Sequence, residues 1–413
     1  MKAWAPTYIP PLPQYQVPGL SLYNSLTSTL DEITEQDVSM YVCGITPYDA
    51  THLGHAATYL AFDMINRYLR LSGKSITYIQ NITDVDDPLL ERANRDGQDW
   101  ESLAQSQISL FRDDMVSLRI LPPDHYMGAV ETIPWVLRAI SKLMDRNAVY
   151  EVEGDLYFDI STDPQFASYT TLTQEEQIAI FAERGGDPNR RGKRHPLDCL
   201  IWRGKREGEP EWPSPFGPGR PGWHIECTAI ALEYLAAPIS IQGGGSDLHF
   251  PHHSMCAAEG RVLTGKDFAK RFVHTGMIGL DGEKMSKSKG NLKFVSVMRN
   301  DSIDPMALRI ALLSGHYRTD RSWSDELLES SQVRLAHWRT ALASPYGGDS
   351  AALIREIITA LSDDLNTPQA FRAVDRWADT RVAALKDSAI ASDDVGEIGQ
   401  VARFLDAALG IAL

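Results

Sequence analysis

The 413-residue sequence predicts an α/β fold: a Rossmann-like parallel sheet that is interrupted by an inserted subdomain and followed by a C-terminal helical bundle. Three observations carry this prediction. Residues 38–82 show a strand, a helix and a second strand in succession, which implies two parallel strands joined by a right-handed crossover. Residues 120–215 interrupt that alternation, and the chain after Asn291 has mainly helical patterns.

The first strand–helix–strand unit has the clearest pattern. Val38–Cys43 is predicted as a short buried strand. Gly54–Leu71 is predicted as a helix, because its apolar residues recur at helical spacing and Gly73 ends it. Ser75–Ile82 is predicted as the next strand. Ligands of parallel sheets bind at the carboxyl ends of the strands. The residues expected to line one crevice there are Cys43, Thr46 and Asn81–Thr83.

The inserted segment is predicted to contain a helix over Ile133–Arg146, a hairpin over Val149–Ile160 and a basic stretch rich in glycine and proline, Glu183–Arg194. The parallel sheet should resume at Ile239–Gln242 and Phe272–Leu280. It is therefore expected to be assembled from two separate parts of the chain.

The C-terminal part is predicted to be a bundle of helices. Asp304-Pro305 is typical of a helix start, because proline is tolerated at the first helical position. Four more helices are predicted at Leu327–Leu342, Ala351–Leu361, Pro368–Leu385 and Val395–Leu409. The expected organisation is an N-terminal extension packed on the core (1–35), two halves of a catalytic domain (36–120 and 216–300), an inserted connective subdomain (121–215) and a helical domain (301–413).

Charge and composition limit the possible partners. The formal net charge is −15, whereas a protein held on many phosphates presents a basic face, so no obligatory nucleic-acid partner is expected. No apolar run reaches the roughly 18 residues of a membrane span, and the N-terminus lacks the apolar core of a signal peptide. Four cysteines are too few for a disulfide framework. We expect a cytoplasmic monomer without a membrane partner.

His52-Leu-Gly-His55 lies where the first predicted helix begins. The free N–H groups and the dipole of a helix N-terminus favour an anion, two imidazoles add donors, and Gly54 lets a base or phosphate approach closely. Far downstream, Lys284-Met-Ser-Lys287-Ser has the composition of a flexible loop whose lysines could close on the β- and γ-phosphates. Taken singly, the two motifs would be a helix cap and a solvated basic loop. Together they indicate a nucleotide-phosphate site.

The candidate metal ligands are Cys43, Cys227 and His252. They lack the short spacing of a zinc finger, so two buried structural cysteines are the alternative. Two thiolates and an imidazole suit zinc, and three protein ligands leave one position for a substrate thiol. The hydroxyl of serine would be a poorer ligand there. Cys256, one helical turn after His252, is either a fourth ligand or a packed cysteine.

Two further motifs carry acidic residues. Gly243-Gly-Gly-Ser-Asp247 follows a predicted strand; its glycines would admit a nucleotide, and Asp247 could accept hydrogen bonds from ribose hydroxyls or an ammonium group. Glycine triplets are also common in turns. Asp84, Asp86 and Asp87 form an acidic run, which we interpret as a solvated loop edge with helix caps and not as a Mg²⁺ site.

Together these motifs resemble the catalytic domain of class I aminoacyl-tRNA synthetases, with His52–His55 as the HIGH motif and Lys284–Ser288 as the KMSKS motif. The candidate metal ligands and Tyr41-Val-Cys-Gly are similar to the cysteine-activating branch. That branch includes the ligases of mycothiol biosynthesis, which join cysteine to glucosaminyl-inositol (GlcN-Ins). Three strings are similar to those ligases, and the resemblance extends from about residue 35 to about residue 300. The strings are Cys43–His55, Gln80–Leu89 and Glu183–Pro188.

Two departures from cysteinyl-tRNA synthetases favour the ligases. Those synthetases carry a glutamate as fourth zinc ligand at the position of Cys256, and a longer C-terminal region with an anticodon-binding domain. One alternative is a cysteinyl-tRNA synthetase that lacks most of that region. The other is a catalytically inactive paralogue acting as a binding protein, which would have lost HIGH or KMSKS residues that this chain keeps.

The resemblance implies an AMP-forming ligase that uses one Zn²⁺, and Mg²⁺ bound with ATP. Cysteine and ATP would give cysteinyl-AMP and pyrophosphate, and the 2-amine of GlcN-Ins would then displace AMP. The implied zinc ligands are Cys43, Cys227 and His252. The implied catalytic residues are His52, His55, Lys284, Lys287 and Asp247, with Asp247 as the hypothesised base for the amine. The residues implied to contact the cysteinyl-adenylate are Cys43, Gly44, Ile45, Thr46, Thr58, Asn81, Ile82, Thr83, Trp223, Gly245, Ser246, Asp247 and Ile278.

Overall fold

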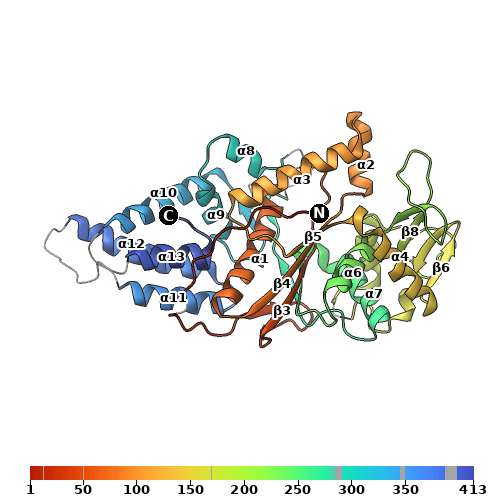
Figure 1. The fold of residues 1–413 in the computed structure, drawn as a ribbon, viewed down its shortest axis with the longest axis horizontal. Helices are drawn as coiled ribbons and strands as arrows, with labels where there is room; N and C mark the ends of the chain where they lie inside the picture. The colour runs from red at the N-terminus through yellow and green to blue at the C-terminus, as the bar shows by residue number, and fades with distance from the viewer. Residues whose placement is uncertain are drawn as a thin grey trace.

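A computed structural model of the protein describes residues 1–12, 14–49, 51–168, 170–280, 283–284, 291–344, 349–386 and 398–413. The molecule is elongated, with the C-terminal helices at one end, the inserted subdomain at the other and the parallel sheet between them (Figure 1). Among the described residues, no helix combines the length and apolar character needed to cross a membrane. The predicted α/β architecture, with its insertion and helical C-terminal part, is confirmed.

The central sheet has five parallel strands in the order β11-β10-β3-β4-β5. The strand order departs from the chain order because β10 and β11 come from the later part of the sequence. Helix α1 (Leu53–Leu71) connects β3 to β4 in the predicted crossover. The strands are β3 (Asp37–Val42), β4 (Ser75–Ile82), β5 (His125–Gly128), β10 (Ile241–Gly245) and β11 (Phe272–Thr275).

The alternation of side chains along β3 decides what each face of the sheet contacts. Met40 and Val42 belong to the hydrophobic cluster formed with α1. Tyr41 and Cys43, which point to the opposite face, pack with residues of α6 (Trp223–Tyr234) and α7 (Ser254–Thr264). Both faces of the sheet are therefore covered, as expected for a parallel sheet.

The inserted subdomain contains a four-stranded antiparallel sheet in the order β6-β7-β8-β9. It comes after β5, which is itself an edge strand of the parallel sheet and lies beyond residue 120. The predicted division into domains stays a prediction. The elements of this subdomain are α4 (Ala129–Asp145), β6 (Val149–Val152), β7 (Asp155–Phe158), a 3₁₀ turn (Ile160–Thr162), α5 (Gln174–Glu183), β8 (Cys199–Gly204) and β9 (Gly219–Pro221).

The segment Phe272–Leu280, predicted to belong wholly to the parallel sheet, divides in two. Its first part is β11, and β12 (Ile278–Leu280) joins a separate sheet with β13 (Glu283–Lys284) and β14 (Arg321–Trp323). Gly276 lies between them, and a Cβ there would come within 2.3 Å of the backbone of Thr319. This close approach of two distant segments directs the chain out of the first sheet.

The remaining elements pack around the central sheet or form the C-terminal end of the molecule. Helices α10 to α13 form the C-terminal bundle, which packs on α1 through α13 and on α9 through α10. Their bounds agree closely with the predicted helices, except that the predicted start of the last helix at Val395 lies outside the described residues. Asp304 caps α9 as predicted. These elements are β1 (Ser21–Asn24), β2 (Thr29–Glu32), α2 (Asp87–Asp96), α3 (Trp100–Ser117), short helical turns at Ser246–Leu248 and His249–His253, α8 (Val295–Asn300), α9 (Pro305–Leu313), α10 (Asp325–Ala343), α11 (Ser350–Ser362), α12 (Thr367–Lys386) and α13 (Ile398–Leu409).

Candidate active site

Cys43, Cys227 and His252 meet behind the carboxyl end of β3. Their ligand atoms all lie within 4.8 Å of one another, and all three side chains are buried. Cys43 follows β3, Cys227 lies on α6, and His252 belongs to the turn that precedes α7. Distant parts of the chain thus supply two thiols and one imidazole to a single point. This donor set could hold a metal ion of the zinc type.

The two thiols of this group differ in acidity. A hydrogen bond from the Cys43 thiol lowers the pKa of Cys227 well below its usual value, although burial opposes that change. Burial raises the pKa of Cys43, since it disfavours the charged form. Cys227 is therefore the more acidic of the two thiols.

The imidazole of His252 is oriented by neighbouring aromatic groups. Its Nδ1 lies 2.9 Å from Nδ1 of His224, and the Trp223 ring stacks on it with centroids 4.3 Å apart. Its Nε2 lies on the side of Cys256, whose sulfur is 3.8 Å away. The Cys256 thiol donates to the carbonyl of His224 at 3.5 Å and is not among the three grouped ligands, which supports its interpretation as a packed cysteine.

A chain of buried side chains behind Cys43 was not predicted. Nε2 of His253 lies 3.3 Å from the Cys43 sulfur, and its Nδ1 lies 2.8 Å from Nε2 of His274. Nδ1 of His274 contacts the Ser25 hydroxyl at 2.8 Å, and the Gln242 amide donates to the Cys43 sulfur at 3.4 Å. Only the His252-His253 doublet could have suggested this arrangement. Partners of this kind orient a metal ligand and tune its basicity.

His52 caps helix α1 with its ring. Its Nδ1 accepts hydrogen bonds from the backbone N–H groups of Gly54 (3.1 Å) and His55 (3.4 Å). Because Nδ1 is an acceptor, the ring proton is carried by Nε2. The His52 and His55 rings stack with centroids 3.6 Å apart. Burial lowers the pKa of His52 to about 4, and that of His55 well below its usual value. At neutral pH both rings are therefore uncharged donors at a helix N-terminus.

The start of α1 is joined to the segment that follows residues 285–290. The Leu53 N–H donates to the carbonyl of Lys293 at 3.0 Å, and the Val295 N–H donates to the carbonyl of Thr51 at 3.0 Å. Of the two predicted catalytic lysines, Lys284 has its backbone paired with Gly279 in β13, and its side chain lies outside the description. Lys287 lies outside the described residues. The roles of both stay predictions.

The ends of β3 and β4 approach each other as predicted. The Gly44 N–H donates to Oδ1 of Asn81 at 2.7 Å, and Nδ2 of Asn81 donates to the Thr83 hydroxyl at 3.3 Å. A Cβ on Gly44 would lie 1.8 Å from the Asn81 carbonyl oxygen, so only glycine fits. The Thr83 N–H donates to the carbonyl of Ile45, which ties the two strand ends together.

The other predicted adenylate residues lie on neighbouring elements. Thr58, on α1, shares a hydrogen bond of 2.9 Å with the hydroxyl of Thr275 at the end of β11. Trp223 begins α6, and Ile278 begins β12. Gly245 ends β10, and the carboxylate of Asp247 lies over it, 2.5 Å from where a Cβ would stand. Ser246 and Ile82 complete the set as neighbours of these residues in the chain.

The acidic run is partly buried, and its interpretation as a solvated loop edge was wrong for Asp84, whereas Asp86 is half-buried. Asp84 is 7% exposed and accepts from the Val130 N–H at 2.9 Å. Asp86 caps α2 and accepts from the Thr46 hydroxyl at 3.4 Å. Burial raises the pKa of each carboxyl to about 6. The predicted capping is confirmed, whereas the burial arises from packing that no local pattern encodes.

A cleft of about 1130 Å³ opens beside these groups. Three of the predicted adenylate residues line one end of it: Thr46, Trp223 and Asp247. From there it extends between α2 and the inserted subdomain. The site therefore has room beyond the strand ends for a second substrate.

Comparison with known proteins identifies relatives along the whole chain. The family model described as tRNA synthetases class I (C) catalytic domain matches residues 29–333. The L-cysteine:1D-myo-inositol 2-amino-2-deoxy-alpha-D-glucopyranoside ligase of Thermomonospora curvata is 54% identical over the full length of both chains, and that of Streptomyces griseus is 52% identical over both full lengths. Methionyl-tRNA synthetase of Mycobacterium tuberculosis, solved with methionyl-adenylate, has the same fold at 17% identity, with a TM-score of 0.63 that covers 92% of this chain and 90% of that chain.

Proposed function

Since the chain belongs to the family of class I tRNA synthetase (C) catalytic domains, and within it to the L-cysteine:1D-myo-inositol 2-amino-2-deoxy-alpha-D-glucopyranoside ligases, we propose that it joins L-cysteine to the 2-amine of GlcN-Ins. The protein is an ATP-dependent, amide-forming ligase. Cysteine would first react with ATP to give cysteinyl-AMP and pyrophosphate. The amine would then attack the acyl carbon and release AMP.

One observation supports this proposal above the others. The Cys43, Cys227 and His252 group, which suits a thiol, lies at the end of the same strand that leads into the His52–His55 turn, which suits phosphates. The Tyr59 hydroxyl of α1 donates to the carbonyl of Cys43 at 3.2 Å and so fixes the strand end against the helix. A molecule with a thiol at one end and a nucleotide at the other matches this arrangement.

The metal that we propose for the thiol-binding group is zinc, held by Cys43, Cys227 and His252. The residues fit such an ion, because all three donor atoms are buried and close together, and His224 engages Nδ1 of His252 while leaving Nε2 to a metal. Bound there, zinc would bind the cysteine sulfur as a thiolate and disfavour serine. Mg²⁺ would enter with ATP.

In the first step, the chain's own residues would act on the phosphates. The Nε2–H of His52 would donate to a negatively charged oxygen at the attacked phosphorus. The positive end of the α1 dipole would attract the phosphates, and His55 would supply the second ring. Lys284 and Lys287 would stabilise the negative charge that develops on the departing pyrophosphate. No covalent enzyme intermediate is required.

In the second step, the amine must lose a proton before or as it attacks. Asp247 is the proposed base, because it lies over the end of β10 and faces the cleft. Asp247→Asn should leave cysteine-dependent ATP–pyrophosphate exchange within about twofold of wild type and slow amide formation by about 100-fold or more. Equal loss of both activities would contradict this role.

The decisive experiment supplies ATP and labelled cysteine together with either GlcN-Ins or tRNA. We expect the label to appear on GlcN-Ins alone, with one AMP released per amide formed. Label on tRNA would instead identify a cysteinyl-tRNA synthetase with a short C-terminal region. The net charge of −15 supports an enzyme without an obligatory nucleic-acid partner, and that the enzyme is a cytoplasmic monomer stays a prediction.

The zinc proposal can be tested apart from activity. The cobalt-substituted protein should show thiolate-to-cobalt absorption that changes when cysteine is added and does not change with serine. Cys227→Ser should lower the metal content. A cobalt spectrum that is indifferent to cysteine would indicate a purely structural ion.

A further inference from the structure

The cleft extends well beyond the residues that we assign to the adenylate. Its volume of about 1130 Å³ exceeds the roughly 300–1,000 Å³ typical of clefts for drug-sized ligands. Its lining carries eight carboxylates and five arginines. A polyanion such as RNA would meet more negative than positive groups here. An uncharged polyol with one amine suits this lining better.

Four side chains in the wall of the cleft form a closed ring of ion pairs, which we call the charge ring: Asp87, Arg203, Glu209 and Arg220. Nη1 of Arg203 lies 3.1 Å from both carboxylate oxygens of Asp87, and its Nη2 lies 3.1 Å from Oε1 of Glu209. Nε of Arg220 donates to Oε2 of Glu209 at 3.0 Å, and its Nη2 donates to Asp87.

The pairing of β8 with β9 creates the ring. Arg203 and Arg220 are direct cross-strand partners, so two like charges stand side by side on one face of the sheet. Such a pair is unfavourable unless anions flank it. Glu209 comes from the loop between the two strands, and Asp87 comes from the first turn of α2. The ring therefore joins the inserted subdomain to the catalytic domain across the cleft.

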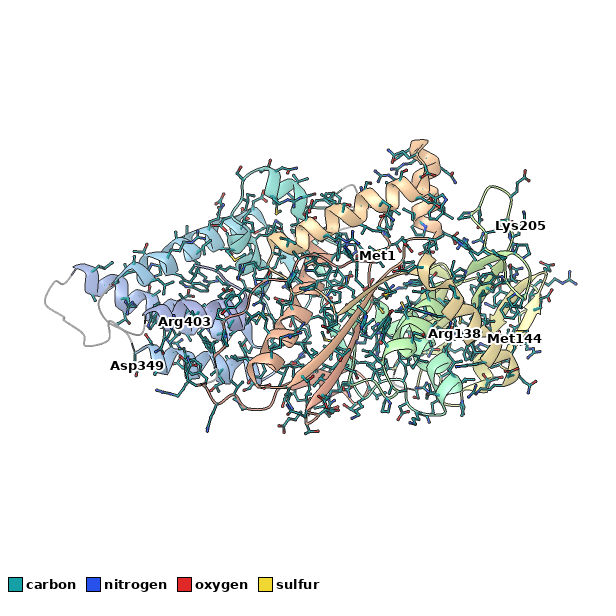
Figure 2. All side chains as sticks on the ribbon, viewed as in Figure 1. Met1, Arg138, Met144, Lys205, Asp349 and Arg403 are labelled. Carbon is teal, nitrogen blue, oxygen red and sulfur yellow. The ribbon has the colours of Figure 1, made fainter. Side chains whose placement is uncertain are left out.

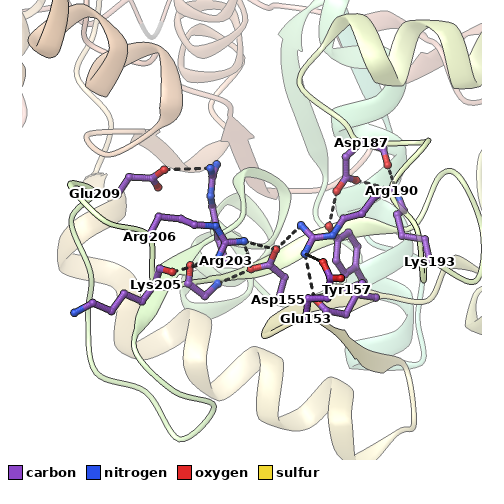
Figure 3. A network of polar contacts seen from close by, with 12 residues as sticks. Glu153, Asp155, Tyr157, Asp187, Arg190, Lys193, Arg203, Lys205, Arg206 and Glu209 are labelled. Carbon is purple, nitrogen blue, oxygen red and sulfur yellow. Dashed lines mark hydrogen bonds and ion pairs between the residues drawn. The ribbon is translucent and has the colours of Figure 1, made fainter.

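The strand that carries Arg203 is fixed from behind. Asp155, on β7, is 1% exposed and pairs with Arg190 at 2.5 Å and with Arg206 at 2.8 Å (Figure 3). Its Oδ1 accepts from the Gly204 N–H at 2.8 Å. These contacts hold β8 and its loop in place, so the charge ring is a pre-formed surface.

The chemistry of the ring matches a polyol. Each hydroxyl both donates and accepts, so one hydroxyl can accept from an arginine and donate to the carboxylate beside it. The ring has no net charge, and the Arg203, Glu209 and Asp87 side chains remain 27%, 25% and 52% exposed. Asp86, which precedes Asp87 in the chain, accepts a hydrogen bond from the Thr46 hydroxyl. A ligand on the ring therefore borders the place where the adenylate's acyl group would lie.

We propose that the charge ring binds the inositol of the acceptor, which carries hydroxyl groups and no amine. Bound there, the inositol directs the glucosamine 2-amine toward Thr46 and Asp247. This inference rests on the proposed function. Arg203, Glu209 and Asp87 are binding residues in this assignment, whereas Asp155 is a positioning residue that acts through β8.

The test compares Glu209→Gln and Arg203→Met with Glu211→Gln. Glu211 lies in the same loop and pairs with Lys205 at 2.9 Å, but it does not line the cleft; Lys205 itself lies at the edge of the molecule (Figure 2). The two ring variants should raise KM for GlcN-Ins about tenfold, the loss expected for one charge-assisted hydrogen bond. Their kcat and their ATP–pyrophosphate exchange should stay within about twofold of wild type, and Glu211→Gln should match wild type throughout.

A second acceptor separates binding of the inositol from binding of the sugar. Wild type should prefer GlcN-Ins to glucosamine in kcat/KM, and the ring variants should reduce that preference about tenfold. The assignment would be overturned if the ring variants kept the wild-type acceptor preference or the wild-type KM for GlcN-Ins. It would also be overturned if the variants lost ATP–pyrophosphate exchange in parallel, because the ring would then serve only to hold the two domains together. If the wild-type protein does not ligate GlcN-Ins although it retains ATP–pyrophosphate exchange, the proposed function is wrong. That result is distinct from a failure of the charge-ring assignment, which is measured on the variants.

Discussion

At the scale of single residues, one buried carboxyl behind the metal-binding group stands out. Glu259, on α7, is fully buried; it accepts from the Thr228 hydroxyl at 2.7 Å and from the Cys199 thiol at 3.5 Å. Burial raises its pKa to about 8, because one hydroxyl donor and one thiol donor do not replace the hydration that a charged carboxylate loses. The carboxyl is therefore mainly protonated at neutral pH. The sequence shows that a glutamate occupies this position, but it does not show that the side chain is buried.

Glu259→Gln should change how stability depends on pH. The carboxyl ionises near 4.5 in the unfolded chain and near 8 in the folded protein, so the folded state holds the extra proton between these values. Its contribution is complete below about pH 4.5 and is lost as the pH rises to about 8, by at most about 1.4 kcal/mol per pH unit. Urea unfolding from pH 5.5 to 8.5 should show this decline in wild type relative to the glutamine variant. A difference that is independent of pH would contradict the assignment.

At the scale of elements, helix α1 shows how a cap and a binding site share one residue. His52 satisfies two N–H groups of the first turn with Nδ1 and leaves its Nε2–H to a ligand. The same turn is paired with Lys293–Val295, so the start of α1 and the chain beyond the lysine motif hold each other in place. The helix itself could be predicted from its periodicity. The pairing could not, because it joins segments about 240 residues apart.

Two substitutions should separate the cap from the chemistry. His52→Asn keeps an acceptor near the position of Nδ1, so its free energy of unfolding should stay within about 0.5 kcal/mol of wild type, whereas His52→Ala should lose about 1 kcal/mol. Both variants lack the distal N–H and should slow ATP–pyrophosphate exchange by about 100-fold or more. Exchange restored in the asparagine variant would show that His52 acts only as a cap.

At the scale of the whole molecule, a buried ionic network joins the C-terminal bundle to the catalytic domain. Asp63 on α1 pairs with Arg67 at 2.8 Å and with Arg309 on α9. Arg67 donates to the carbonyls of Asp406 and Ala407 in α13, and Arg309 donates to that of Leu409 at 2.7 Å. The three charged side chains of this network are fully buried, so each depends on the others.

Asp63→Asn should destabilise the protein by about 3–5 kcal/mol, because it leaves two buried guanidinium groups with no anion. The control is Glu233→Gln, which breaks the exposed pair with Arg138 and should cost less than about 1 kcal/mol. Chemical denaturation measures both. Similar losses in the two variants would show that water reaches the network. Exchange activity of Asp63→Asn at low temperature should persist, because Asp63 does not touch the site.

The sequence by itself determined the features that arise from local spacing. Periodicity, caps and glycines defined the strand–helix–strand unit, the C-terminal helices and the His52–His55 turn. Residue chemistry made Cys43, Cys227 and His252 candidate metal ligands, and the family resemblance was needed to prefer them over structural cysteines. Only the tertiary structure decided which groups meet. It placed His253 beside Cys43, moved Ile278–Leu280 into a second sheet, buried Asp84 and closed the charge ring. The reason is physical: a local pattern fixes the direction of a side chain on its element, whereas burial and partners depend on how distant elements pack.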